Sequence, residues 1–315
     1  MTLDEIFKEI NNAESIVILT HESPDGDAVG SSLAMKLALE KIGKKPDVII
    51  HSYAEVFKFL PGTQDIKETS EITNYDLAIA LDCATLKRLK EGQYFENAKK
   101  TIVIDHHGSN NMFGDFNFVN PVSPACCEIL AGVFEYYNIN IDKEIGSCLI
   151  TGIITDTGGF QYASTTAETF EFAAELLRKG VNVSDIFQRV MRTVSMAHFE
   201  LTKRVMDRME ILENGKVAFT YINNADVDEV DAKEGDDEGL VELGRDIVGV
   251  EVSILLKQKE DGYKVSLRST SYVNVSDVCL MFGGGGHPRA AGAFIKGTTE
   301  EVKQKLLKEI EKVLE

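Results

Sequence analysis

The chain has 315 residues, 43% of them hydrophobic and 27% charged, which is the balance of an ordinary globular protein. At roughly 100–200 residues per domain, this length indicates two domains. Asp and Glu outnumber Lys and Arg by 51 to 33, and the formal charge of −18 argues against a protein that coats long nucleic acids or anionic lipid through a basic face. A small anionic substrate remains compatible, because bound metal ions reverse the field within one site.

The cysteines and the N-terminus favour a cytoplasmic protein. The chain has five cysteines and no Cys-x-x-Cys pair: Cys83, Cys126, Cys127, Cys148 and Cys279. Neither a disulfide framework nor a zinc ribbon fits this pattern. The N-terminus alternates charged and apolar residues, unlike a signal peptide, and no apolar run approaches the ~20 residues of a membrane span. We therefore expect buried, reduced thiols and a cytoplasmic location.

Four short apolar runs in the first part of the chain predict parallel strands that are buried on both faces. They are continuous rather than alternating, and they span residues 15–20, 47–50, 76–82 and 101–105. Between the first two, Val29, Leu33 and Leu37 follow helical spacing, and Gly43 is placed to end that helix. The succession of strand, helix and strand predicts βαβ units in an α/β fold.

Helical patterns follow, and strand-like patterns begin at Lys216. The helical patterns cover 126–137, 143–154, 167–179 and 196–212, and the strand-like ones cover 217–222, 250–256 and 263–267. We expect one apolar stripe to face a core or to bridge the domains, and the acidic stretch 224–238 to be solvated; the stripe consists of Met196, Phe199, Val205, Met206, Met209 and Leu212. A final amphipathic helix starts at a capping box of Thr298 and Glu301.

Residues that can bind metal follow three of the predicted strands. His21 ends the first, Asp82 the second, and Asp105-His106-His107 the third. In open parallel sheets, ligands bind beyond the carboxyl ends of the strands, so these side chains are expected to converge. Three further aspartates are candidates. Asp25 and Asp27 lie shortly after His21, and Asp156 follows an apolar segment. Taken alone, Asp25 and Asp156 could be helix caps.

Carboxylates packed this closely repel one another unless a cation is present. Their mixture suits Mn²⁺ or Mg²⁺, with Co²⁺ as a further candidate, and disfavours a structural zinc site because no thiolate takes part. The six candidate ligands are too many for one catalytic ion but fit two ions that share a bridging carboxylate: His21, Asp25, Asp27, Asp82, His106 and Asp156. Phosphoester hydrolysis is the chemistry that such a pair favours.

A glycine run near the C-terminus is a second candidate site. Residues 283–286 are all glycine, so their backbone N–H groups can form an anion-binding nest, to which Arg268 and His287 would add charge-assisted hydrogen bonds. The alternative is a flexible loop. We expect His51 and His198, which lack such neighbours, to be ordinary structural or surface residues.

These motifs resemble those of the DHH phosphoesterase family, in which His-x3-Asp-x-Asp, a strand-end Asp, Asp-His-His and a fourth Asp follow in this order. Residues 283–292 and Ser266–Ser269 resemble two motifs of the DHH-associated C-terminal domain. The layout is similar to that of bacterial nanoRNases, which are oligoribonucleases and pAp phosphatases, with relatives that hydrolyse pApA. The resemblance implies a parallel-sheet DHH domain at 1–190, a linker helix at 191–215, and a smaller α/β substrate-binding domain at 216–315 across a cleft.

The resemblance also implies roles. His21, Asp25 and Asp82 would hold one ion, Mn²⁺ above all; Asp27, Asp82, His106 and Asp156 would hold the other, with Asp82 as the bridge. His107 would contact the scissile phosphate, and Asp105 would orient a histidine. The substrate would be held by a set of residues in the C-terminal domain: Arg268, Ser269, Gly284, Gly285, Gly286 and His287.

The resulting hypothesis is a two-metal phosphodiesterase that hydrolyses very short oligonucleotides or linear dinucleotides to mononucleotides. Three alternatives stay open: a cyclic dinucleotide phosphodiesterase acting on c-di-AMP, an inorganic pyrophosphatase, and a regulator with a decayed site. No long nucleic acid and no membrane is expected as a partner, and a homodimer is compatible with the sequence.

Overall fold

The structure, a computed structural model, describes residues 2–233 and 235–314. The chain divides into two compact units, the first ending at Thr193 and the second beginning at Val194. Each unit has its own sheet and its own buried apolar cluster. Among the described residues, no helix combines the length and the apolar character that crossing a membrane requires.

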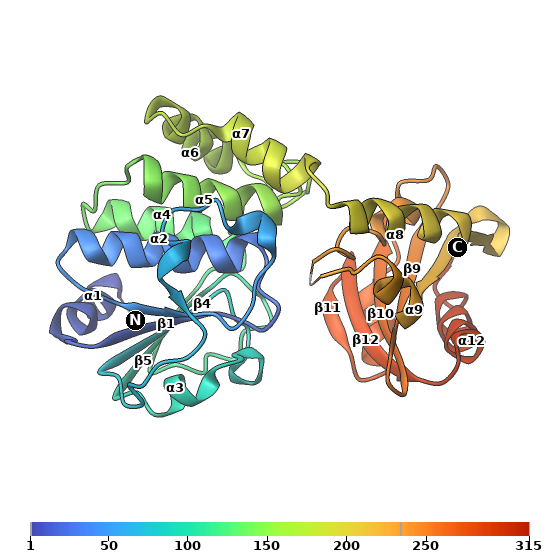
Figure 1. The fold of residues 1–315 in the computed structure, drawn as a ribbon, viewed down its shortest axis with the longest axis horizontal. Coiled ribbons are helices and arrows are strands. Elements are labelled where there is room, and N and C mark those ends of the chain that lie inside the picture. Colours follow the sequence, from blue (N-terminus) through green and yellow to red (C-terminus); the bar gives the residue numbers. More distant parts are fainter. Residues whose placement is uncertain (1, 234, 315) are drawn as a thin grey trace. The chain divides into compact units, whose positions relative to one another are not determined.

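The first unit is an α/β layer structure (Figure 1). Its strands are β1 (Ile16–Leu19), β2 (Asp47–Ile49), β3 (Ile66–Lys67), β4 (Leu77–Leu81), β5 (Lys100–Asp105) and β6 (Phe116–Val119). Its α-helices are α1 (Leu3–Asn12), α2 (Gly26–Lys41), α3 (Gly92–Glu96), α4 (Cys126–Tyr136), α5 (Lys143–Asp156), α6 (Ala167–Arg178) and α7 (Val183–Phe187).

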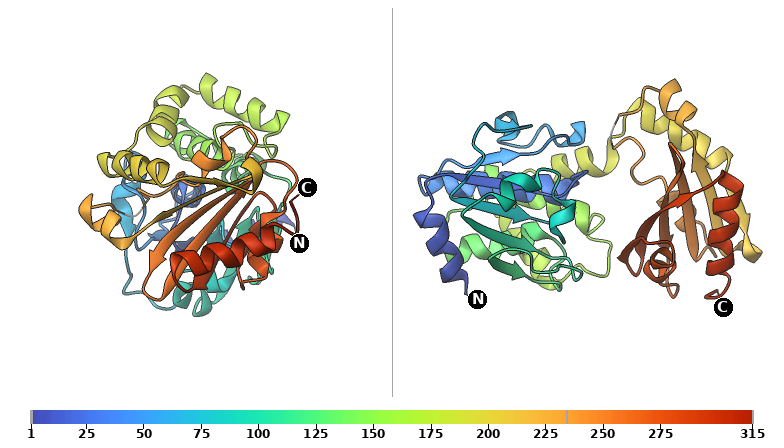
Figure 2. Two further views of the ribbon diagram at one scale, coloured as in Figure 1. Left: turned by 90° about the vertical axis from the view of Figure 1, so that its right-hand side faces the viewer. Right: turned by 90° about the horizontal axis from the view of Figure 1, so that it is seen from below.

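The six strands of this unit are all parallel, in the order β3-β2-β1-β4-β5-β6. Helices α2, α4 and α5 cover one face and α3 the other (Figures 1 and 2). The sheet is therefore buried on both sides, which is why its strands read as continuous apolar runs. The parallel sheet with flanking helices that the sequence predicted is confirmed.

The second unit is built on a mostly antiparallel sheet. Its helices are α8 (Met196–Asp207), α9 (Asn224–Glu229), α10 (Glu242–Arg245), α11 (Val275–Leu280) and α12 (Thr299–Ile310). Its strands are β7 (Glu210–Leu212), β8 (Val217–Ile222), β9 (Val252–Lys259), β10 (Gly262–Ser269), β11 (Gly285–His287) and β12 (Ala290–Lys296). They lie in the order β11-β12-β10-β9-β8-β7, with α12 on one face and α8 on the other (Figure 1).

Helix α8 departs from the prediction in two ways. It ends at Asp207, because Glu210–Leu212 leave the helical path to pair with β8. Its buried side chains are Leu201 and Val205, whereas Met196 is 73% exposed and Phe199 and Met206 are also exposed. The expected stripe is therefore confirmed at Val205, and at Met209, which packs against the same cluster, and is wrong for Met196, Phe199 and Met206.

The acidic stretch after β8 is also more ordered than expected. Asp226 in α9 is buried, and its carboxylate accepts hydrogen bonds from the guanidinium groups of Arg204 and Arg208 in α8. The stretch therefore contributes one buried ion-paired anchor rather than a wholly solvated segment; Glu234 within it lies outside the described residues.

Candidate metal centre

The carboxyl ends of β1, β4 and β5 converge at one edge of the first sheet. Residue His21 follows β1, Asp82 follows β4, and Asp105 is the last residue of β5. Because the three strands are parallel neighbours, the side chains that leave their ends face a common space.

The amino end of α2 adds two carboxylates. Asp25 is the N-cap of α2, and its Oδ1 accepts hydrogen bonds from the N–H groups of Asp27 and Ala28. The carboxylate of Asp27 is fully buried and accepts the N–H groups of Cys126 at 2.5 Å and Cys127 at 2.9 Å, which begin α4. These two bonds fix Asp27 against the positive end of α4.

Close packing of α2 on α5 brings Asp156 to the same place. A Cβ atom on Gly30 would lie 2.5 Å from the carbonyl oxygen of Cys148, and one on Gly152 would lie 2.4 Å from Oδ1 of Asp27. Only glycine allows this approach of the two helices. Asp156, the last residue of α5, thereby reaches the edge of the sheet although it follows a helix and not a strand.

A first cluster of candidate ligands consists of His21, Asp25 and Asp82, whose ligand atoms lie within 4.8 Å of one another. The Nε2 of His21 is 3.9 Å from Oδ2 of Asp25 and 3.6 Å from Oδ2 of Asp82. The Nδ1–H of this ring donates to the carbonyl oxygen of Glu22, which leaves Nε2 directed at the two carboxylates.

A second cluster consists of Asp27, His106 and Asp156. The Nε2 of His106 lies 3.9 Å from Oδ2 of Asp27, 3.2 Å from Oδ2 of Asp156 and 3.3 Å from Oδ1 of Asp82. Its Nδ1 is 3.3 Å from the carbonyl oxygen of Ser123, so this ring too presents Nε2 to carboxylates.

Asp82 joins the two clusters, because its Oδ2 faces His21 and its Oδ1 faces His106. The residue is 1% exposed and has a left-handed φ of 52°, a strained backbone that is typical of functional sites. Its Oδ1 is buried and has no hydrogen-bond partner among the described residues. A buried carboxylate oxygen is costly without a partner, and a divalent cation would supply one, so the residues fit a metal centre.

The pKa values describe how strongly these groups interact. Burial opposes the charged form of His21, but the hydrogen bond and charge of Asp82 outweigh it and raise the pKa of the ring to about 9. Burial likewise opposes charge on His106, yet Asp156 and Asp82 raise its pKa to about 12. Burial alone would raise the pKa of Asp82, but its close approach to His106 and His21 favours the ionised carboxylate and holds that pKa well below its usual range.

Two of the aspartates show the opposite shift. Burial and the charge of Asp82 raise the pKa of Asp27 to about 7, and burial with the charges of Asp25 and Asp27 raises that of Asp156 well above its ordinary value. Carboxylates crowded in this way hold protons unless another cation neutralises them. The arrangement can therefore bind divalent ions by exchanging protons for metal.

His107 and Asp105 form a hydrogen-bonded pair beside the clusters. The Nδ1–H of His107 donates to Oδ1 of Asp105 at 2.7 Å, and the side-chain amide of Asn110 donates to Oδ2 of Asp105 at 2.7 Å. Asn110 also donates to the carbonyl oxygen of Cys83 next to Asp82. Sequence reasoning missed Asn110, whose only signal is its place in the turn after Asp-His-His.

The predicted substrate residues of the second unit form a different kind of environment. Arg268 Nε donates to Oε1 of Glu242 at 2.8 Å, and Ser269 is buried with its hydroxyl donating to the carbonyl oxygen of Val273. Gly285, Gly286 and His287 form β11, which pairs with β12, so they are not a free loop. A Cβ on Gly284 would lie 2.1 Å from the carbonyl oxygen of Gly292, so sheet packing accounts for that glycine, whereas Gly285 faces open space.

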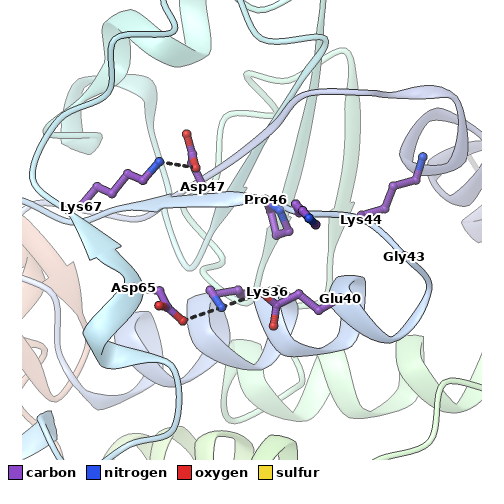
Figure 3. Close-up of a pocket in the computed structure, with 9 residues that line it drawn as sticks. Lys36, Glu40, Gly43, Lys44, Pro46, Asp47, Asp65 and Lys67 are labelled. Carbon is purple, nitrogen blue, oxygen red and sulfur yellow. Dashed lines mark hydrogen bonds and ion pairs between the residues drawn. The ribbon is translucent and has the colours of Figure 1, made fainter.

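A hollow of about 440 Å³ lies elsewhere in the first unit, beside the amino end of β2 (Figure 3). Buried Lys36 points toward Glu40 at 2.8 Å and Asp65 at 2.9 Å, and Lys67 pairs with Asp47 at 2.7 Å. These ion pairs satisfy the lysines within the protein, and none of the candidate ligands lines the hollow.

Comparisons with known proteins point to one family. The N-terminal domain of the DHH family matches residues 15–153, and the DHHA1 domain matches residues 214–315. The bifunctional oligoribonuclease and PAP phosphatase NrnA of Thermus thermophilus is 33% identical over 93% of this chain and 87% of that protein. The cyclic-di-AMP phosphodiesterase PdeA of Listeria monocytogenes is 25% identical, and this chain spans only 48% of its length.

Solved structures agree with this result. An exopolyphosphatase-related protein from Bacteroides fragilis has a TM-score of 0.88 at 31% identity, with 97% of this chain and 95% of that one covered. The RecJ protein of Thermus thermophilus in complex with Mn²⁺ has a TM-score of 0.58 at 13% identity, covering 99% of this chain and 54% of that one. The second likeness concerns the fold alone.

Proposed function

The chain belongs to the DHH family, and from that premise we propose that it is a metal-dependent phosphodiesterase. In this proposal it hydrolyses very short oligonucleotides and linear dinucleotides such as pApA to mononucleotides. It also dephosphorylates pAp. The observation that carries the proposal is Asp82, one buried carboxylate whose two oxygens face two separate groups of ligands. The likeness to NrnA over most of both chains supports the substrate class.

In this proposal one ion is held by His21, Asp25 and Asp82, and the other by a set that shares Asp82: Asp27, Asp82, His106 and Asp156. Bound divalent ions would lower the pKa of a coordinated water and neutralise charge on a phosphoryl group. We prefer Mn²⁺, with Mg²⁺ or Co²⁺ as alternatives, because imidazole and carboxylate ligands are mixed.

Two further polar residues of this site, His107 and Asp105, do not bind metal in this proposal but position a ring and its proton. Asp105 accepts the Nδ1–H of His107, which fixes the tautomer with Nε2 as the acceptor and turns that atom away from Asp105. We assign to His107 contact with the scissile phosphate, and to Asp105, itself held by Asn110, the orientation of that ring.

In the second unit we propose residues 216–315 as the part that holds the nucleotide, after a linker at 191–215. Arg268 and His287 are the candidates for the terminal phosphate, and Gly285 is the glycine of β11 that leaves room for close approach. Ser269, Gly284 and Gly286 would then act by shaping this edge of the sheet. A cytoplasmic location and a homodimer remain predictions.

Product analysis tests the proposal, with Mn²⁺ or with EDTA, on pApA, pAp, c-di-AMP, a five-nucleotide RNA, a 24-nucleotide RNA and pyrophosphate. We expect metal-dependent AMP release from pApA and the five-nucleotide RNA, with the long RNA spared. Turnover of pyrophosphate alone, or of c-di-AMP in strong preference to pApA, would overturn it in favour of the corresponding alternative.

A further inference from the structure

The turn that follows Asp156 has an unusual backbone. Gly158 and Gly159 have left-handed φ angles of 58° and 71°, and Phe160 follows with a φ of 69°. Glycine adopts this conformation without penalty, but a bulky aromatic residue does not. Strain of this kind is retained mainly where the surrounding structure needs a particular side-chain position.

This turn folds Tyr162 back onto the end of α5. The N–H groups of Gln161 and Tyr162 both donate to the carbonyl oxygen of Thr157, at 2.9 and 3.0 Å, and the N–H of Phe160 donates to Oγ1 of Thr157. A Cβ on Gly158 would lie 2.5 Å from Cζ of Tyr162. The tyrosine ring therefore lies directly on the backbone two residues beyond Asp156.

Core packing does not account for this ring. Phe160 stacks on Phe170 with ring centroids 5.3 Å apart, and Phe187 fills the space above Gly159. Tyr162, in contrast, is 45% exposed and belongs to none of the apolar clusters formed by residues 2–233 and 235–314. A strained turn thus presents an aromatic surface to solvent, with the ring placed on the backbone two residues beyond the candidate ligand Asp156.

We propose that Tyr162 is the stacking platform for a nucleobase of the substrate at the metal centre. The inference rests on the proposed function and adds to it a base contact supplied by the first unit. Every base has a π-face, so stacking holds any nucleotide without reading its sequence. Stacking also needs no row of basic side chains along the nucleic acid, which suits a chain with a formal charge of −18.

The kinetic test compares three substrates in three proteins. Wild type, Tyr162→Phe and Tyr162→Ala are assayed on pApA and on analogues in which one or the other base is replaced by an abasic ribose. We expect Tyr162→Ala to lower kcat/KM for pApA about tenfold, Tyr162→Phe to retain it, and the alanine variant to match wild type on the analogue that lacks the stacked base. An unchanged alanine variant, or an equal loss on all substrates, would overturn the inference.

A binding test separates this inference from the proposed function. The chain contains no tryptophan, so Tyr162→Trp creates a single fluorescent reporter, and Tyr136→Trp, at a position that is 53% exposed in α4, provides the matched control. We expect AMP with Mg²⁺ to quench the first and not the second. Equal responses of the two variants would contradict stacking, whereas failure of wild type to cleave pApA would contradict the proposed function instead.

Discussion

In the first unit three of the candidate ligands, His21, Asp27 and Asp82, are buried, and the first two N–H groups of α4 hold Asp27 from behind. In the second unit the candidate substrate residues other than Ser269 are at least partly exposed, and among the described residues Arg268 donates to the side chain of Glu242 and to the carbonyl oxygen of Leu267. The contrast separates two tasks. A metal centre must be rigid before its ion arrives, whereas a substrate grip can be ordered by the substrate itself.

The largest effect should come from removing the residue that joins the two clusters. Asp82→Ala is expected to lower kcat for pApA by about 10³-fold or more, since several kcal/mol of charge stabilisation depend on both ions. The matched variant Arg268→Ala should mainly raise KM for substrates with a terminal phosphate. Steady-state kinetics and the metal content of each variant measure this difference. If the two variants behave alike, the contrast between the two units is contradicted.

The next effect concerns helix packing. Gly152→Ala places a methyl group 2.4 Å from Oδ1 of Asp27 and from Sγ of Cys127, so we expect it to lower the free energy of unfolding by about 1–3 kcal/mol and to weaken metal binding. Gly285→Ala, where the added methyl group meets open space, is the control and should leave stability unchanged. Denaturant titration of both variants measures the difference; a harmless Gly152→Ala would show that α2 and α5 are free to separate.

A smaller effect is expected at Asn110. Asn110→Ala removes the donor that holds Asp105, so the orientation of His107 is lost while every candidate ligand remains. We expect kcat to fall about 10-fold to 100-fold with metal content unchanged. Loss of metal in this variant would instead place Asn110 among the supports of the ligands themselves.

The smallest effect belongs to the second unit and depends on pH. The hydrogen bond from Arg208 lowers the pKa of Asp226 to about 2 from an ordinary value near 3.8. The carboxylate therefore stabilises the folded unit above pH 4, and this contribution is lost as the pH falls from about 4 toward 2. Asp226→Asn should be less stable than wild type at pH 7, and the gap should narrow in that acidic range, as thermal unfolding would show.

Much of the first unit follows from the sequence because its signals are local. Continuous apolar runs predict buried parallel strands, and each places its candidate ligand at the strand end, as with Asp82. The two backbone hydrogen bonds that hold the Asp27 carboxylate could not be predicted, because their donors are about 100 residues away along the chain. Asn110 was missed for a similar reason, since its role depends on how a turn folds back onto Asp105.

The errors in the second unit also have physical causes. An apolar stripe shows which residues share a helix face but not how much of that face is buried, and in α8 the stripe residue Val205 is buried whereas Met196 and Phe199 are exposed. A run of glycines predicts close approach of some partner. For Gly284 that partner is the neighbouring strand.

The two units have separate apolar cores, and all the candidate metal ligands belong to the first. Ions that bind only the folded first unit would stabilise it by mass action without affecting the second. Calorimetric scans in EDTA and in Mn²⁺ should therefore differ in one melting transition and agree in the other. The supply of metal ions would then determine how long the first unit resists proteolysis, without affecting the second unit.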